Sequence, residues 1–252
     1  MVPAHEARAP LAAIFDMDGL LVDSEPLWRE TETAILRRLG VPVTPQRCAE
    51  TRGMAVGEVC RYWFARHPWA GPTPAAVADE IVEVLATAFG TRLEPKPGAA
   101  GALSSARRRG VALALASSSP RRLIELCLRR FHWDDGVFAV VHSAQDEPAG
   151  KPDPAVFLTT ATRLGVDPGR CVVFEDSPAG VAAAVSAGMT CVAVPEEQPS
   201  SLPAVGYEHA HRIVAALTAV DDGFWDSLGV PPAAGPGPPL DLTGVGEDRP
   251  RL

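Results

Sequence analysis

Short apolar runs alternate with helical patterns along most of this chain, and this alternation limits its fold more than any other feature. Runs typical of buried strands lie at 11–15, 111–116, 137–141, 171–174 and 190–194, and helical segments lie near 99–109, 120–131, 154–164, 178–187 and 207–219. The clearest helix has Ile124, Cys127, Leu128 and Phe131 at i, i+3, i+4, i+7 spacing. The pattern predicts an α/β fold with a doubly wound, parallel, five-stranded Rossmann-like core, which binds ligands outside the carboxyl ends of its strands.

Residues 23–95 interrupt this alternation and predict a second, helical unit. Helical patterns cover 27–39, 56–66 and 75–89 with no convincing strand between them, and a Pro- and Gly-rich segment at 94–98 leads back to the core. Segments of that composition are natural hinges. We therefore expect an inserted α-helical cap domain at 23–95 that closes over a strand-end site. The catalytic core would comprise 9–22 and 96–220, and the Pro-rich residues 229–252 would form a disordered tail.

Composition argues against several classes of partner. The chain has 23 basic and 31 acidic residues, and its formal charge of −8 argues against nonspecific binding to nucleic acid or anionic membranes. No apolar stretch approaches the length of about 18 residues that a transmembrane helix needs, so none is expected. The five cysteines show no C-x-x-C spacing, which favours buried free thiols in a reducing compartment and hence a cytoplasmic protein.

The segment after the first apolar run carries two carboxylates. Asp16 and Asp18 follow the run at 11–15, and the alternation of side chains along a strand would send both to the same face. Two acids at a strand end, with Gly19 beside them for close backbone approach, suit a phosphate-and-metal site. A polar loop that merely ends a strand is the alternative. A calcium loop does not fit, because its Gly belongs at the sixth position and its Glu at the twelfth, whereas Gly19 is fourth and Leu27 is twelfth.

Two more strand ends carry groups that suit an anion. After the second strand, Ser119 and Pro120 are typical of a helix N-cap and first turn, so helix amides and the Ser117 hydroxyl would converge where the strand stops. An ordinary Ser-rich cap is the alternative. After the third strand, Lys151 precedes another pattern of this kind. Lys151 is one of two lysines in the chain, and neutralisation of a phosphate competes there with the usual solvated charge.

The fourth strand ends in Glu175 and Asp176, directly before a third cap pattern at Ser177 and Pro178. Adjacent acids at a helix start could simply favour the helix dipole. Carboxylates at a strand tip also fit a hard cation such as Mg²⁺, which keeps several waters and takes phosphate oxygens. Because the four motifs fall on four strand ends that would meet at one edge of a parallel sheet, we interpret them together as an active site.

The order of these motifs resembles a known family. Asp16-x-Asp18-Gly19, followed by Ser117, Lys151 and then Glu175-Asp176, resembles the haloacid dehalogenase superfamily of phosphohydrolases over roughly residues 11–220. The insertion after strand one resembles the subclass with a helical cap at that point. The segments 15–28 and 63–72 are similar, more narrowly, to the hexitol phosphatase and 2-deoxyglucose-6-phosphatase branch. One departure is that Arg52 precedes Gly53, where related enzymes carry an Arg two or three positions after the Gly.

The resemblance implies a phosphatase that hydrolyses a small sugar or sugar-alcohol phosphate with Mg²⁺ as cofactor. It implies that Asp16 is the nucleophile and forms an aspartyl-phosphate, and that Asp18 protonates the leaving alkoxide and then deprotonates the attacking water. The other implied groups hold the phosphoryl and the metal: Ser117, Ser118 and Lys151 bind phosphate, while Asp16, the Asp18 carbonyl, Asp176 and, directly or through water, Glu175 hold Mg²⁺. The expected partner is a small phosphorylated metabolite, and we expect the protein to be a monomer.

Chemical requirements argue against two other activities of the superfamily, and two alternatives stay open. A dehalogenase needs neither the second Asp of the first motif nor the metal-binding acids, and a phosphonatase needs a lysine in the cap, where residues 26–92 have none. A β-phosphoglucomutase-like phosphomutase stays open, because cap arginines could hold a second phosphate: Arg29, Arg37, Arg38, Arg47, Arg52, Arg61 and Arg66. A non-catalytic, ligand-binding relative is the other alternative, less favoured because the set of acids is complete.

Overall fold

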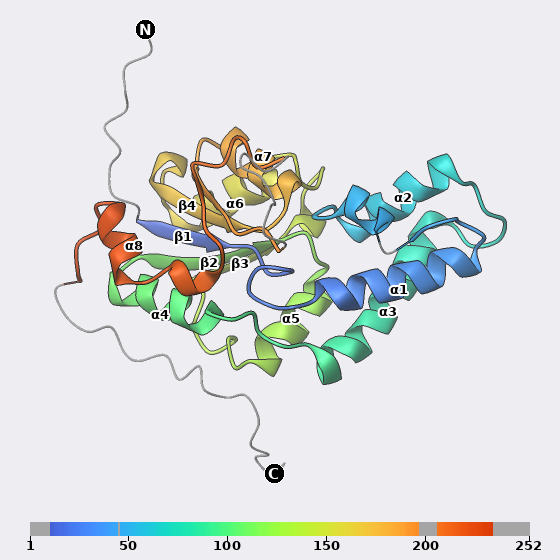
Figure 1. Ribbon diagram of the computed structural model, residues 1–252, viewed down its shortest axis with the longest axis horizontal. Helices are drawn as coiled ribbons and strands as arrows, with labels where there is room; N and C mark the ends of the chain where they lie inside the picture. Colours follow the sequence, from blue (N-terminus) through green and yellow to red (C-terminus); the bar gives the residue numbers. More distant parts are fainter. Residues whose placement is uncertain (1–10, 45, 197–205, 234–252) are drawn as a thin grey trace, which may run out of the picture.

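The computed structural model describes residues 11–44, 46–196 and 206–233, and it shows an α/β protein built on one parallel sheet (Figure 1). The strand order is β3-β2-β1-β4-β5-β6. The strands are β1 (Ala12–Phe15), β2 (Ala112–Ser117), β3 (Val140–Ser143), β4 (Cys171–Glu175), β5 (Thr190–Ala193) and β6 (Arg212–Ile213). The predicted fold class is confirmed. Most of the expected tail at 229–252 lies outside the described residues.

The sheet register lines up the ends of the three central strands. Phe15, the last residue of β1, pairs with Leu115 of β2 on one side and Phe174 of β4 on the other. The residues that follow these positions therefore emerge together at the carboxyl edge of the sheet, where ligands bind in folds of this kind. The rings of Phe15 and Phe174 stack with centroids 4.6 Å apart, which fixes the two strand ends against each other.

Helices cover both faces of the sheet, so its strands are apolar throughout. Ala13 and Phe15 belong to one core cluster, while Ala12 and Ile14 belong to the other, as the period of two along a strand requires. The first face is covered by α4 (Ala99–Arg108), α5 (Arg121–Arg130) and α8 (Asp222–Ser227), and the second by α6 (Ala155–Leu164) and α7 (Pro178–Ser186) (Figure 1). Burial on both faces explains the continuous apolar runs in the sequence.

A group of helices lies between β1 and β2 in the chain and beyond the carboxyl end of β1 in space (Figure 1). It contains α1 (Glu25–Arg38), the short η1 (Arg47–Thr51), α2 (Val56–Arg66) and α3 (Pro74–Arg92). We call residues 25–92 the helical insertion. Helix α3 packs against α1, α2 and the core helix α5, and the three predicted helical segments are confirmed. Among the described helices, none combines the length and apolar character that crossing a membrane requires.

The chain after β5 departs from the sequence prediction. We expected a helix near 207–219 and five strands, but residues 212 and 213 instead form β6, which pairs with β5 as a sixth strand. Ile213, Leu217 and Val220 have spacing close to that of a helix, yet the β-branched Ile213 fits the sheet edge, and Leu217 and Val220 are buried in the core cluster that α4 covers. Helix α8 follows, capped by Asp221, whose carboxylate accepts from the Phe224 N–H at 2.9 Å.

Candidate active site

A buried lysine joins two of the strand ends. Lys151 is 2% exposed, and its Nζ lies 2.5 Å from Asp16 Oδ1 and 2.5 Å from Glu175 Oε1. Burial alone would lower the pKa of Lys151, but the charges of Asp16 and Glu175 outweigh it and raise that pKa, so the ammonium stays protonated. The sequence left open whether Lys151 is solvated. The structure shows that it is not, and that it bridges the acids of the first and fourth motifs.

Glu175 is held on both of its carboxylate oxygens. Lys151 binds one, and the other accepts from the Ser177 N–H at 3.2 Å and the Ser177 hydroxyl at 3.0 Å. The Ser177 hydroxyl also accepts from the Gly180 N–H at 3.0 Å, which makes Ser177 the N-cap of α7, as predicted. A Cβ at Gly180 would collide with the Glu175 carboxylate. Gly180 therefore lets the first turn of α7 approach this acid closely.

Replacing Gly180 with Ala should lower kcat/KM by roughly 10²-fold, because the new methyl must push the Glu175 carboxylate, and Lys151 with it, out of place. Kinetics with p-nitrophenyl phosphate on purified, folded protein would measure this. Gly101→Ala in α4 is the matched control, since a Cβ there meets no atom within 4 Å. The control should keep full activity and gain about 0.5–1 kcal/mol of stability. Full activity in Gly180→Ala would contradict the placement of Glu175.

Asp176 lies beside these acids with an unpartnered oxygen. Its buried Oδ2 has no hydrogen bond, and oxygens of Asp16, Glu175 and Asp176 lie within 4.8 Å of one another. Burial, reinforced by Glu175 and Asp16, raises the pKa of Asp176. Gly19, at φ +75°, brings the backbone so close that a Cβ there would strike Asp176, and Tyr207 donates to the Asp176 carbonyl at 2.6 Å. Three carboxylates against one ammonium leave an excess of negative charge, which a hard divalent cation such as Mg²⁺ fits.

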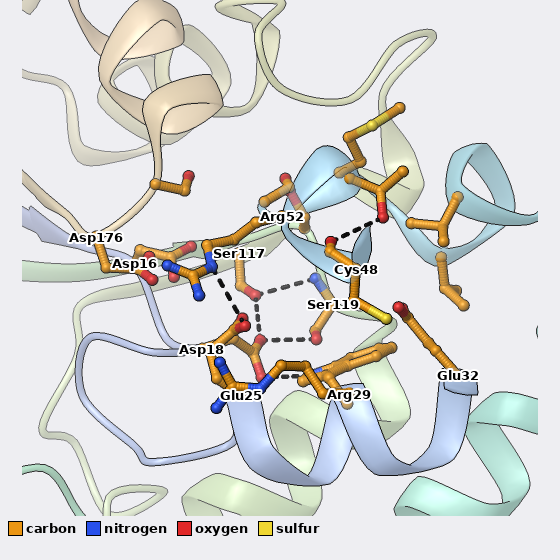
Figure 2. Close-up of a pocket in the computed structure, with 18 residues that line it drawn as sticks. Asp16, Asp18, Glu25, Arg29, Glu32, Cys48, Arg52, Ser117, Ser119 and Asp176 are labelled. Carbon is orange, nitrogen blue, oxygen red and sulfur yellow. Dashed lines mark hydrogen bonds and ion pairs between the residues drawn. The ribbon is translucent and has the colours of Figure 1, made fainter. Parts of the chain in front are cut away.

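The Asp18 carboxylate is fixed by donors from two parts of the chain (Figure 2). Ser119 donates its hydroxyl to Asp18 at 2.7 Å and Ser117 at 3.3 Å, both from the core. From the start of α1, Ser24 donates at 2.8 Å and Trp28 donates its indole N–H at 3.0 Å. The prediction did not include Ser24 and Trp28 in the site, although both lie inside the 15–28 segment. Asp18 therefore faces the insertion with an orientation set by four groups.

The helix after β2 begins later than the sequence predicted. We expected Ser119 as its N-cap and Pro120 as its first residue, but Pro120 is the cap residue and α5 begins at Arg121, with no side-chain cap. The Ser119 hydroxyl binds Asp18 instead, and the Ser119 N–H donates to the Ser117 hydroxyl at 3.0 Å. The Ser119 hydroxyl therefore binds Asp18, from another strand end, instead of capping its own helix. The sequence of this turn alone could not predict that contact.

Several of these groups line one pocket between the strand ends and the helical insertion. It has about 620 Å³ of space free of protein atoms, including its opening to solvent. Asp16, Asp18, Ser117, Ser118 and Asp176 line its core side. Of the predicted site residues, Lys151 and Glu175 do not line the pocket but lie buried behind Asp16.

The insertion touches the strand ends directly. The Ser118 hydroxyl donates to the Gly53 carbonyl at 2.8 Å, so this predicted phosphate ligand also joins the core to the insertion. Gly53 has a φ of +81°, and a Cβ there would collide with Ser177. The Gly150 N–H donates to Glu58 of α2 at 3.3 Å. The insertion therefore contacts the strand ends and forms part of the pocket wall.

Two arginines of the insertion line the pocket, and both are paired. Arg52 Nη2 lies 2.7 Å from Glu196 Oε2, and its Nε lies 3.4 Å from Glu25 Oε2. Arg29 Nη1 lies 3.6 Å from the same Glu196 oxygen. The sequence gave no signal for Glu196, which comes from the loop after β5 and meets Arg52 only through the fold. Arg52 precedes Gly53, whereas related enzymes carry an Arg after the Gly, but Arg52 nevertheless lines the pocket.

Comparison with known proteins assigns the chain to a family. The model of the haloacid dehalogenase-like hydrolases matches residues 11–188. The chain belongs to this family. The predictions of its superfamily and of a hydrolase are thereby confirmed. The match ends just before β5 and includes all four strand-end motifs described above.

Individual relatives cover most of this chain. It is 37% identical over 197 residues to hexitol phosphatase B of Escherichia coli (strain K12), spanning 78% of this chain and 88% of the relative. It is 34% identical over 178 residues to a phosphorylated carbohydrates phosphatase of Thermotoga maritima, spanning 71% and 82%. Among solved structures, a putative beta-phosphoglucomutase from Bacteroides vulgatus superposes with a TM-score of 0.75 at 25% identity, covering 89% of this chain and 91% of that one.

Proposed function

We propose that this hydrolase is a Mg²⁺-dependent phosphatase that acts on a small sugar or sugar-alcohol phosphate through an aspartyl-phosphate at Asp16. The observation that carries the proposal is the pairing of Asp16 and Asp18 on one pocket wall, with Lys151 behind Asp16 and the unpartnered Asp176 beside it. The similarity to a hexitol phosphatase and to a phosphorylated carbohydrates phosphatase supports the substrate class.

In the proposed reaction, an Asp16 oxygen attacks phosphorus, and the bond from phosphorus to the leaving oxygen breaks. Asp18 gives its proton to the departing alkoxide, which leaves as an alcohol. Asp18 then takes a proton from water, the resulting hydroxide attacks phosphorus, and the bond to Asp16 breaks to release inorganic phosphate. Ser24 and Trp28 hold the Asp18 carboxyl in place for both proton transfers.

The other site residues would neutralise and position the phosphoryl group. Lys151 places a positive charge next to Asp16, and Ser117 ends β2 at the same edge, with Ser118 directly after it. Asp16, the Asp18 carbonyl and Asp176 would hold Mg²⁺, with Glu175 acting through water because its oxygens already accept from Lys151 and Ser177. When bound, the metal would offset charge on the phosphoryl oxygens.

Charge in the pocket favours the phosphatase over a phosphomutase. A mutase must hold a second phosphate at a distance from the nucleophile, which requires cations that are free to bind it. Among the described pocket residues, the basic side chains are Arg29 and Arg52, and both already pair with Glu196, as Arg52 does with Glu25. We therefore propose that water, rather than a sugar hydroxyl, accepts the phosphoryl group.

A screen of hexose, deoxyhexose and hexitol phosphates, with p-nitrophenyl phosphate as a general substrate, tests this function. We expect Mg²⁺-dependent release of inorganic phosphate from at least one sugar or sugar-alcohol phosphate, with no isomeric product. Interconversion of glucose 1-phosphate and glucose 6-phosphate with little free phosphate would favour the mutase. No phosphate release from any compound, p-nitrophenyl phosphate included, would favour a non-catalytic ligand-binding protein.

A further inference from the structure

The pocket wall supplied by α1 continues well beyond the catalytic carboxylates. Glu25, Trp28, Arg29 and Glu32 all line the pocket, and their spacing of three, four and seven residues places them on one stripe of the helix. Trp28 binds Asp18, and Glu32 follows one turn later, roughly 6 Å further along the helix axis. Glu32 therefore stands at the far end of the pocket from the strand tips (Figure 2).

Glu32 is an acid in an unusual position. It is 6% exposed, and its side chain points from α1 toward Cys48 (Figure 2). Within the described residues it forms no ion pair, and the Cys48 thiol to which it points contacts the Thr33 hydroxyl at 3.6 Å. The neighbouring pocket residues Val56 and Val59 are apolar. Among the residues that the structure describes, no ion pair therefore offsets the burial of this carboxyl.

The energetics of this position point to a ligand. Burial, followed by the charge of Glu25, raises the pKa of Glu32 to about 8, so at neutral pH the group is a neutral acid that can both donate and accept. An apolar side chain of similar size at this position would avoid the cost of burying a poorly partnered polar group. A neutral hydroxyl is the partner that such an acid suits. A second phosphate is a poorer partner, because at this position it would lie against an acid rather than against a cation.

We propose that Glu32 is a specificity-determining residue that hydrogen-bonds a hydroxyl of the substrate's leaving group, and so selects polyhydroxylated phosphate esters. This inference rests on the proposed function, in that the phosphoryl group lies at Asp16 and the carbon chain extends along α1. The recognised class is a neutral, hydroxyl-bearing chain long enough to reach one helical turn past Trp28. Simple aryl or alkyl phosphates lack such a hydroxyl, so they make no use of Glu32.

The test measures binding separately from turnover. Calorimetry in Mg²⁺, on full-length protein carrying Asp16→Asn to prevent hydrolysis, compares the affinities for sorbitol 6-phosphate and phenyl phosphate. Adding Glu32→Leu should weaken sorbitol 6-phosphate binding roughly tenfold or more and change phenyl phosphate binding by less than about twofold. Glu32→Gln, which keeps a donor and an acceptor, should retain most of the affinity. Glu30→Gln is the matched control, because Glu30 is exposed on α1, where it pairs with Arg92.

Two outcomes would overturn the role of Glu32. One is equal binding of sorbitol 6-phosphate with and without Glu32→Leu, or no measurable binding to the Asp16→Asn parent. The other is an equal loss for both ligands, or a large fall in melting temperature, which would mark a structural role. Turnover by protein with Asp16 intact separates this inference from the proposed function. Glu32-dependent binding with no phosphate release would contradict the function alone, whereas normal release by Glu32→Leu with unchanged affinity would contradict this inference alone.

Discussion

Asp16→Asn is expected to reduce phosphate release by roughly 10³-fold or more while leaving the fold intact. The amide cannot attack phosphorus, and it removes one negative charge from the group formed with Glu175 and Asp176. The fold should survive, because the Asn oxygen can still accept from Lys151 and the side chain has the same shape. Steady-state kinetics with p-nitrophenyl phosphate would measure the loss, and circular dichroism would check the fold.

Asp23→Asn is the matched control for this variant. Asp23 lies in the same segment 15–28 as Asp16, but its side chain is 45% exposed and pairs with Lys96 at 3.0 Å, outside the pocket lining. It should keep activity within about twofold, since exposed ion pairs contribute little. If Asp16→Asn kept more than a few per cent of wild-type turnover, Asp16 could not be the nucleophile.

Removal of Mg²⁺ is expected to abolish activity. Asp16, Glu175 and Asp176 place three carboxylates around the single ammonium of Lys151, and Asp176 Oδ2 has no partner within the described residues. A divalent cation would offset this charge and polarise the phosphoryl group. Dialysis against EDTA should stop phosphate release, and added Mg²⁺ should restore it. Excess Ca²⁺ should inhibit, because its larger and looser coordination would misplace the nucleophile.

A binding measurement supports the kinetic one. Mg²⁺ should raise the melting temperature of the dialysed protein, because a ligand that binds only the native state stabilises it. Asp176→Asn should weaken this effect and require more Mg²⁺ for activity. Full activity in a preparation shown by elemental analysis to hold no divalent metal would contradict the metal site.

The sequence predicted the core of the site because each motif is local to a strand end. Asp16 and Asp18 follow one apolar run, Glu175 and Asp176 end another, and a parallel sheet brings such ends to one edge. The burial of Lys151 between two acids could not be predicted, because it depends on the loop after β3 turning back beneath Asp16. The sequence therefore indicated the residue types of the site but not which of them face the pocket.

The residues on the far side of the pocket could not be predicted from the sequence, for a different reason. Glu196 and Arg52 are separated by 144 residues and come from the core and the insertion, so only the packing of the two parts reveals their contact. Glu32 lies on the buried side of α1. From sequence alone, however, a charged residue in a helix is expected to be exposed, so Glu32 was not predicted to line a site. In the fold, the two-residue strand β6 was missed because so short a strand has no period of its own.

The acceptor of the phosphoryl group is the central point of this account, and an isotope measurement tests it most directly. The best substrate of the phosphate-ester screen would be turned over with Mg²⁺ in H₂¹⁸O, and the products would be analysed by mass spectrometry. We expect one ¹⁸O atom in each released phosphate and none in the sugar or sugar alcohol, since water attacks phosphorus. Phosphate retained on the sugar as an isomer, with little labelled phosphate released, would contradict the account and assign the enzyme to the phosphomutases.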